Sequence, residues 1–200
     1  PALPYLMPLA AMLVATLLVQ ATTGRFPYTY GLKPLLAGLV LHNYRRSYPA
    51  LLHRPSWLGA LVGFVVWVVW AALVRPGEAV SPYQALSPGW SEAWIALRMV
   101  GGVLVVPLVE ELAFRGYLMR RLQGEMFERF DGPTTLRALL LSSIAFGLMH
   151  DAWLAGSLAG LAYGWVATRP GGLSNAVVAH LLTNLLLAVQ VLVLKQWGLW

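Results

Sequence analysis

The sequence predicts an all-α protein, a polytopic transmembrane bundle of about seven to eight helices around an intramembrane polar cavity. Hydrophobic residues make up 58% of the 200 residues and charged residues only 11%. Soluble domains usually carry about a quarter charged residues, so this chain lacks the composition of an ordinary wet surface. Several apolar segments approach the roughly 20 residues that cross a bilayer as a helix. The nine tryptophans fit the aromatic belts of membrane proteins.

Seven segments have the composition of membrane helices. The fourth is the longest, and it contains Gly101, Gly102 and Pro107, which are expected to interrupt it. The fifth and sixth are short, which indicates either a tilted pair or a partly re-entrant one. An eighth helix would lie before the first residue or in residues 82–94. The seven segments are residues 3–21, 32–41, 57–74, 90–122, 136–149, 152–168 and 174–194.

Two connections are long enough to form substantial loops. Residues 75–89 are rich in proline and glycine, and residues 123–133 form the other loop. Neither connection separates two hydrophobic cores, so residues 1–200 are expected to form one integral-membrane domain, with the motif-bearing core at about 90–194. The chain starts with Pro1 rather than methionine, and we therefore expect a segment before it.

The distribution of arginine predicts an orientation in the membrane. Residues 42–55 contain three arginines and no acid, and residues 115–137 contain five arginines against three acids. The positive-inside rule puts these two segments and Arg169 in the cytoplasm, together with the N-terminus. The net charge of +6 is explained by these flanking cations, and no basic patch with exposed aromatics predicts a nucleic-acid partner.

The stretch VPLVEELAFRG places two carboxylates and a guanidinium inside an apolar segment. Ionisable groups in membrane helices are costly and are functional-site candidates. On a helix Glu111 and Arg115 share a face at i,i+4, whereas Glu110 is rotated by roughly 100° and lacks that partner. One carboxylate would be neutralised and the other left for chemistry. The alternative is a salt bridge at a membrane interface.

Two further pairs of residues have the same i,i+4 spacing. Phe146 and His150 lie in FGLMHD, and His180 and Asn184 lie in AHLLTN. A lone histidine at a helix end, such as His150, is more often a hydrogen-bonded interface residue than a catalyst. Taken alone, His180 and Asn184 slightly favour a structural role, with hydrogen bonds between membrane helices. The combination of the three sets in one membrane chain favours a shared site.

In order, these three sets resemble the motifs of the CPBP family, the CAAX-protease and bacteriocin-processing membrane proteins, also called ABI-type intramembrane proteases. The resemblance covers residues 90–194. The first half, with PYLMPLAAMLVA and NYRRSYPALL, is similar to the bacterial branch associated with exosortase systems. This similarity implies association or fusion with an exosortase-type protein. It also implies location in the bacterial inner membrane.

The resemblance implies a membrane endopeptidase whose active site faces the cytoplasmic side. It implies that Glu110 and His150 activate water, while His180 and Asn184 form an oxyanion hole. Glu111 and Arg115 would hold the helix geometry, with Phe146 in a supporting position. The chemistry is reasonable, because a carboxylate in a low-dielectric cavity becomes a stronger base. Donors aimed at the developing oxyanion are typically worth about 3–4 kcal/mol each.

Other hydrolytic mechanisms are weaker. Glu110, His150 and His180 have the donor types of a catalytic zinc site, but the chain has no HExxH motif to favour it. We therefore expect no cofactor, with zinc as the alternative. Ser157 lies in GSLAG, which lacks the usual spacing of a serine nucleophile. The only aspartates, Asp131 and Asp151, lie outside the predicted spans.

A non-proteolytic class of function also fits the polar residues. They could line the substrate or proton pathway of a small transporter, or belong to a non-catalytic scaffold that confers bacteriocin immunity. For the protease, the expected partners are the lipid bilayer and a membrane-anchored protein or peptide substrate.

One geometric mismatch opposes a shared site. If residue 137 lies at the cytoplasmic surface, His150 sits about 20 Å along its helix. His180 sits only about 9 Å into its own helix. The two histidines can meet only if the helix carrying His150 starts outside the bilayer or tilts strongly.

Overall fold

The computed structural model describes residues 2–23, 30–77, 89–127 and 133–199. Within these residues the chain forms seven helices and no strand, counting the segments from α4 to α6 as one continuous helix. Three of these helices are long and apolar enough to cross a membrane: Leu3–Ala21, Trp90–Arg121 and Gly172–Leu194. The predicted helical membrane bundle is confirmed. Most of the region suggested for an eighth helix, residues 82–88, lies outside the described residues.

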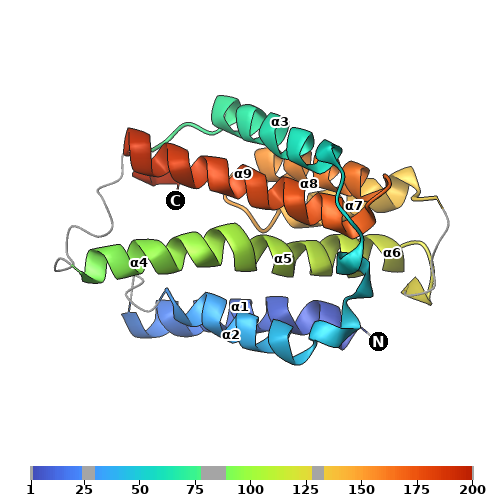
Figure 1. Ribbon diagram of the computed structural model, residues 1–200, viewed down its shortest axis with the longest axis horizontal. Helices are drawn as coiled ribbons and strands as arrows, with labels where there is room; N and C mark the ends of the chain where they lie inside the picture. The colour runs from blue at the N-terminus through green and yellow to red at the C-terminus, as the bar shows by residue number, and fades with distance from the viewer. Residues whose placement is uncertain (1, 24–29, 78–88, 128–132, 200) are drawn as a thin grey trace.

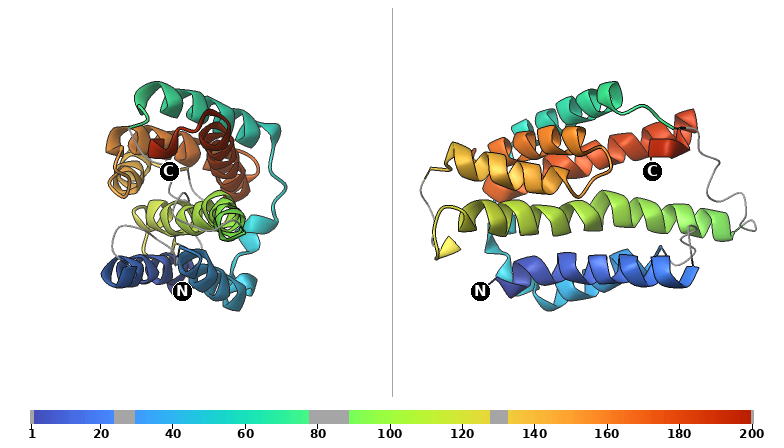
Figure 2. Two further views of the ribbon diagram at one scale, coloured as in Figure 1. Left: turned by 90° about the vertical axis from the view of Figure 1, so that its left-hand side faces the viewer. Right: turned by 180° about the vertical axis from the view of Figure 1, so that it is seen from behind.

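The helices lie in three layers along one long axis (Figures 1 and 2). One outer layer consists of α1 (Leu3–Thr23) and α2 (Leu32–Asn43). The continuous helix Trp90–Arg121 forms the middle layer and is therefore in contact with helices on both sides. The other outer layer contains four helices, α3 (Trp57–Leu73), α7 (Leu136–Gly147), α8 (Trp153–Ala167) and α9 (Gly172–Leu194).

Apolar side chains cover the outer faces of the bundle. Leu17 on α1, Phe64 on α3 and Val193 on α9 are all exposed. In water such a surface would be an aggregation hazard, whereas in a bilayer it contacts lipid tails. The burial pattern therefore agrees with the composition in placing the protein in a membrane.

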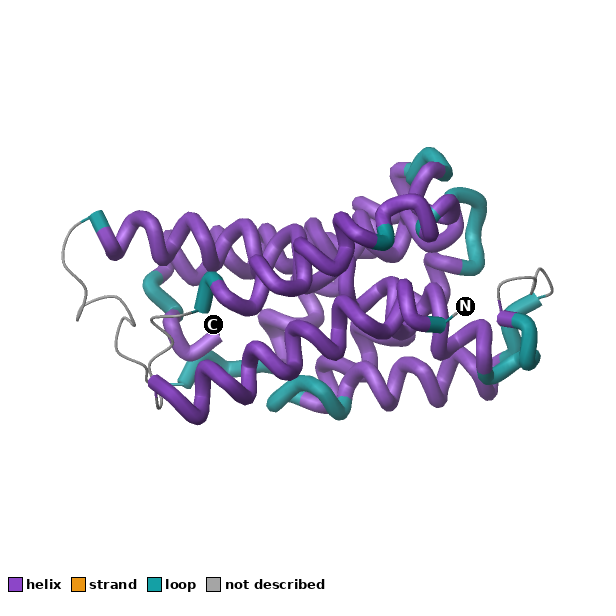
Figure 3. The backbone as a smooth tube through the Cα atoms, turned by 90° about the horizontal axis from the view of Figure 1, so that it is seen from below, coloured by secondary structure: helices purple, strands orange, loops and turns teal. Residues whose placement is uncertain are grey.

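Most loops gather at the two ends of the bundle (Figure 3). We call them the α4 end, where α4 (Trp90–Met99) begins, and the α6 end, where α6 (Met119–Arg121) stops. Three parts of the chain that carry arginine lie at the α6 end (Figure 1): the segment Arg45–Ser47 after α2, α6 itself, and the turn with Arg169 after α8. The fold thus brings together the segments that the positive-inside rule assigned to one side.

The central helix switches from α-helical to π-helical hydrogen bonding at two places. The segments Val100–Val105 and Leu112–Leu118 are π-helical, and α5 (Val106–Glu111) lies between them. The sequence predicted interruptions at the glycines and the proline of this region. The structure instead keeps the helix continuous and widens it locally to i→i+5 hydrogen bonds. Such π segments are often found at functional sites, and here they flank the two glutamates.

Pro107 leaves a gap in the π segment that another helix fills. The N–H of Val106 donates to the carbonyl of Gly101, which is the i→i+5 register. In that register the carbonyl of Gly102 would accept from residue 107, but proline has no N–H. The side chain of Asn184 on α9 donates to this carbonyl instead, with 2.8 Å between Nδ2 and oxygen. The hydrogen bond fixes the central helix against α9 beside the candidate site.

The α7–α8 pair is a hairpin that turns back inside the bundle. The two helices have 12 and 15 residues, about 18 and 22 Å, which is shorter than a hydrocarbon core of about 30 Å. The turn between them lies part-way along the bundle, short of the α4 end (Figures 1 and 2). Of the two predicted arrangements, the structure therefore favours the re-entrant one.

The hairpin removes much of the expected difference in depth between His150 and His180. Helix α7 stops at Gly147, so His150 is in the turn rather than on the helix. Helix α9 begins at Gly172, two residues earlier than the sequence predicted. The depths of the Gly147 end of α7 and of His180 along their helices therefore differ by only about 5 Å. The helices are tilted differently (Figure 1), and this tilt compensates for the remaining difference in depth.

Two glycines four residues apart allow α3 and α9 to pack closely. A Cβ atom at Gly59 would lie 2.9 Å from the carbonyl oxygen of Asn175, and one at Gly63 would overlap the carbonyl of Ala179. Thr183 donates a hydrogen bond of 2.9 Å to the carbonyl of Gly63. Small residues at this spacing are typical of close contacts between membrane helices. The contact determines the position of the α9 segment that carries His180.

We predict that Gly63→Ala destabilises the protein, because the added methyl group forces α3 away from α9. Overpacking of this kind costs about 1–3 kcal/mol of unfolding free energy. Thermal unfolding in detergent, followed by tryptophan fluorescence, measures the effect. Gly38→Ala is the matched control, since a Cβ there has no neighbour within 4 Å. Equal stability of the two variants would contradict the close contact.

Candidate active site

A buried ion pair anchors the central helix to the hairpin. Glu111 is 0% exposed and Arg115 is 2% exposed. The Nη1 atom of Arg115 donates to Oε1 of Glu111 at 3.0 Å, which is the i,i+4 pair that the sequence predicted. Its Nη2 atom donates to the carbonyl of Gly160 on α8 at 2.8 Å. Arg115 therefore links the middle layer to the hairpin through a charge that is itself neutralised.

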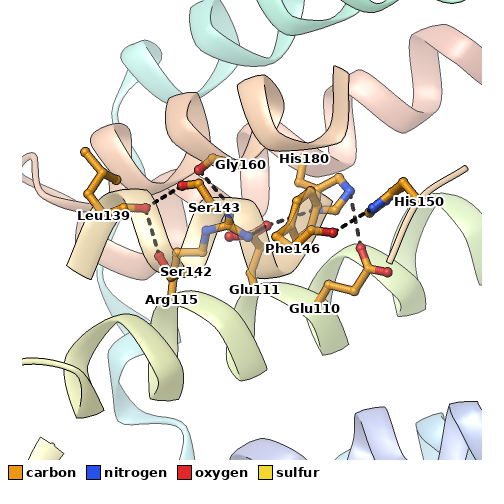
Figure 4. A network of polar contacts seen from close by, with 10 residues as sticks. All are labelled: Glu110, Glu111, Arg115, Leu139, Ser142, Ser143, Phe146, His150, Gly160 and His180. Carbon is orange, nitrogen blue, oxygen red and sulfur yellow. Dashed lines mark hydrogen bonds and ion pairs between the residues drawn. The ribbon is translucent and has the colours of Figure 1, made fainter. Parts of the chain in front are cut away.

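The same glutamate oxygen also holds His180 (Figure 4). The Nδ1 atom of His180 lies 3.0 Å from Oε1 of Glu111. Because the Glu111 carboxylate that pairs with Arg115 can only accept, Nδ1 must carry the hydrogen. The other ring nitrogen, Nε2, lies 3.7 Å from Oε2 of Glu110. His180 thus bridges the two glutamates, a contact that the spacing within a single helix could not reveal.

Glu110 is the carboxylate that does not pair with Arg115. Its side chain is buried, and its Oε2 atom makes no hydrogen bond with the described residues. With His180 neutral, two carboxylates and one guanidinium would leave a net charge of −1 in an apolar interior, which is costly. One further proton on the pair formed by Glu110 and His180 makes the cluster neutral. The cluster therefore has a place for one further proton.

His150 approaches from the turn of the hairpin. Its Nδ1 atom lies 3.0 Å from the carbonyl oxygen of Phe146 and donates to it, so in the neutral ring Nε2 is an acceptor. The ring centroids of Phe146 and His150 are 4.7 Å apart. The Phe146 ring also contacts the guanidinium of Arg115, at 4.4 Å, and the ring of His180, at 5.6 Å. Phe146 thus holds the charged and aromatic groups of the site in place.

The four predicted catalytic side chains line one cavity. Glu110, His150, His180 and Asn184 come from three parts of the chain and face a space of about 190 Å³. That volume is enough for several water molecules. Asn184 is partly committed, because one of its two amide hydrogens is given to Gly102. The structure therefore brings together all the residues that the sequence singled out as candidates.

Several cavity residues were missed by sequence reasoning. Tyr163 stacks on His180 with 4.6 Å between ring centroids and an interplanar angle of 20°. Tyr30 and Thr183 also line the cavity. The signal for Tyr163 was present, since it is an aromatic residue with a polar tip among small residues in GSLAGLAYG. Arg98, near the start of the central helix, also lines the cavity.

The arrangement of the candidate donors bears on the zinc alternative. Among the described residues, no group of three or more His, Asp or Glu side chains is arranged so that it could hold a metal ion. Glu110, His150 and His180 face one cavity, yet they do not form such a group in this arrangement. Zinc at these residues remains a prediction.

The comparisons with known proteins point to the same class. A family model described as type II CAAX prenyl endopeptidase, Rce1-like, matches residues 92–186. This segment contains all of the predicted site residues, and the match confirms the resemblance to the CPBP membrane proteases. Neither the curated proteins nor the solved structures contain a match to this chain.

We predict that Arg115→Met destabilises the protein by about 3–5 kcal/mol, because it leaves the buried Glu111 without its cation. Glu111→Gln should also destabilise, since it strands the buried guanidinium. The double variant should be more stable than either single variant, because neither charge is then left alone. Thermal unfolding of the four proteins in detergent tests the coupling. Additive losses in the double variant would show that the pair does not act as a unit.

Proposed function

We propose that this chain, a CPBP-type membrane protein with an Rce1-like segment at residues 92–186, is an intramembrane endopeptidase. It would hydrolyse a peptide bond in a membrane-associated protein or peptide. The observation that carries the proposal is the position of Glu110. Its carboxylate faces a cavity shared with two histidines, while the neighbouring Glu111 is held by Arg115 and His180.

Glu110 is the general base in this proposal. A water molecule between Glu110 and His150 gives a proton to the carboxylate, and its oxygen attacks the scissile carbonyl carbon. The free Nε2 of His150 accepts a hydrogen bond from the same water and orients it. The proton on Glu110 is then transferred to the leaving amine as the C–N bond breaks. General acid–base catalysis of this kind contributes about 10²–10⁴-fold in rate.

His180 and Asn184 are the oxyanion donors. When His180 carries the additional proton, Nε2 becomes a donor, and the carboxylate of Glu111 stabilises the cation through Nδ1. Asn184 retains one amide hydrogen after its bond to Gly102. Preorganised donors in a site with little water stabilise the developing oxyanion strongly. Glu111 would therefore support catalysis through His180 in addition to holding Arg115.

The proposal includes a position in the membrane. Glu110 lies 11 residues before the end of the central helix and 20 residues after its beginning, about 16 Å and 30 Å. The cluster is therefore nearer to the α6 end, which the arginine distribution predicts to be cytoplasmic. This position supports catalytic groups toward the cytoplasmic side, and location in the bacterial inner membrane stays a prediction from the resemblance. An exosortase-type partner stays a prediction from the first half of the sequence.

Glu110→Gln should remove proteolysis, with a loss of at least about 100-fold, while the fold is retained. Cells expressing the wild type or the variant at matched levels are compared by mass spectrometry of membrane-protein termini. Glu125→Gln is the control, because it makes the same change at an exposed glutamate near the α6 end. New termini that appear with the wild type and the control, but not with Glu110→Gln, would identify both the activity and the substrate.

Identical termini in all three strains, with each protein folded, would favour the scaffold or transport alternative. Cleavage by purified protein that survives treatment with a strong chelator would oppose the zinc alternative. Loss of cleavage on chelation, and its recovery with Zn²⁺, would favour zinc.

A further inference from the structure

A second cavity lies at the α6 end of the bundle, apart from the candidate active site. Its volume of about 610 Å³ is within the range of small-molecule sites. Its walls come from α1, the segment after α2, the end of the central helix, the segment before α7 and the α8–α9 connection. Among the described residues, the two cavities share no lining residue. We call this space the α6-end cavity.

The lining of the α6-end cavity is cationic. Three of its described lining residues are arginines, one is a histidine and none is an acid. Arg115 and Arg120 both have partners within the protein. Arg169 lies in the turn between α8 and α9, with its guanidinium carbon 4.6 Å from the ring centroid of Trp165. This ring contact restricts the guanidinium without using its N–H donors, which suit an oxygen ligand.

Backbone donors lie beside Arg169. Gly172 and Leu173, in the first turn of α9, line the same cavity. The first N–H groups of a helix have no acceptor within the helix, and the helix dipole adds positive potential there. The N–H of Gly172 donates to the carbonyl of Arg169, so the N–H groups that follow supply the donors. Gly171, at the cap position, has no side chain that could accept from them. The start of α9 and Arg169 together favour a ligand with negatively charged oxygens.

A buried donor adds positive potential at the inner wall of the cavity. Arg115 lines the cavity and is 2% exposed. Two of its N–H groups hold Glu111 and the carbonyl of Gly160. Its Nε atom has no hydrogen-bond acceptor among the described residues. Buried donors without an acceptor are rare in proteins, so the inner wall has a demand for negative charge that the described residues do not meet.

We propose that the α6-end cavity binds the phosphate of an anionic phospholipid headgroup. The arginine distribution predicts that this end of the bundle is cytoplasmic, and the cytoplasmic leaflet carries anionic lipids. Trp165 is 40% exposed, and amphipathic rings of this kind lie at the level of lipid headgroups. Met119, Ala167 and Leu173 give the cavity apolar walls for the rest of the lipid. Binding at this cavity is independent of the proposed proteolysis.

Lipid binding is measured with the purified full chain in a neutral detergent. Phosphatidylglycerol is the anionic probe, and phosphatidylcholine with the same acyl chains is the neutral probe. Native mass spectrometry counts the bound lipids and gives the dissociation constant of the first one. We expect the first phosphatidylglycerol to bind at least about fivefold more tightly, because the choline group of the other lipid brings a cation close to Arg169.

Arg169→Gln should weaken the binding of phosphatidylglycerol about 10-fold, because a charge-assisted donor is lost. Arg169→Lys should retain part of the affinity, since it keeps the charge but not the planar fork. Arg121→Gln is the matched control. It removes the same charge from an exposed arginine on α6 that does not line the cavity. Its affinity for the lipid should stay within about twofold of the wild type.

Equal affinities of the wild type for the two lipids would overturn the proposal. Equal losses in Arg169→Gln and Arg121→Gln would overturn it as well, because they would indicate attraction to the general surface charge.

Inorganic phosphate, added as a competitor at constant ionic strength, separates the two sources of a phosphate group. Displacement of phosphatidylglycerol by a comparable concentration of phosphate would overturn the assignment to a lipid and indicate a site for a free anion. No displacement, together with a loss of affinity in Arg169→Gln that Arg121→Gln does not show, would support the lipid site.

Discussion

The site depends on one carboxylate oxygen, Oε1 of Glu111, which accepts hydrogen bonds from Arg115 and His180. The first bond joins the central helix to α8, because the same guanidinium also reaches the carbonyl of Gly160. The second joins it to α9 and fixes which nitrogen of His180 carries the hydrogen. In an apolar interior these contacts lose little to screening, so removing one partner strands the others. The residue that holds the fold, Glu111, is thus adjacent to Glu110, the base of the proposed mechanism.

The irregular register of the central helix makes this arrangement possible. A regular α-helix would have paired the Gly102 carbonyl within its own backbone, and Asn184 would have had nothing to bind there. The π segment and Pro107 free that carbonyl, and α9 is tied to the central helix at the level of the cavity. The second π segment follows Glu111 directly and contains Arg115. The backbone distortions and the polar cluster therefore form one structural unit.

Much of the fold and the site could be predicted from the sequence, and the parts that could not share a physical reason. The seven helices follow from apolar segment lengths, and the Glu111–Arg115 pair follows from i,i+4 spacing. Both are local properties of the chain. The bond between Glu111 and His180 joins residues 69 positions apart and depends on how helices pack. The hairpin turn at His150 and the inward position of Arg98 likewise depend on neighbours that periodicity does not identify.

The α7–α8 turn also bears on how a hydrolase can work below the membrane surface. Its backbone leaves the helix part-way along the bundle. Inside a bilayer, such backbone persists only when it is sheltered by protein or borders a hydrated space. The turn carries His150 to the wall of the cavity that Glu110 and Asn184 also line, and these polar side chains favour hydration of that space. Water that hydrates the interrupted helix would therefore also be available for hydrolysis of a peptide bond. If α7 were straight, its backbone would need no water at this point. The proposed hydrolysis would then lack a local source of water.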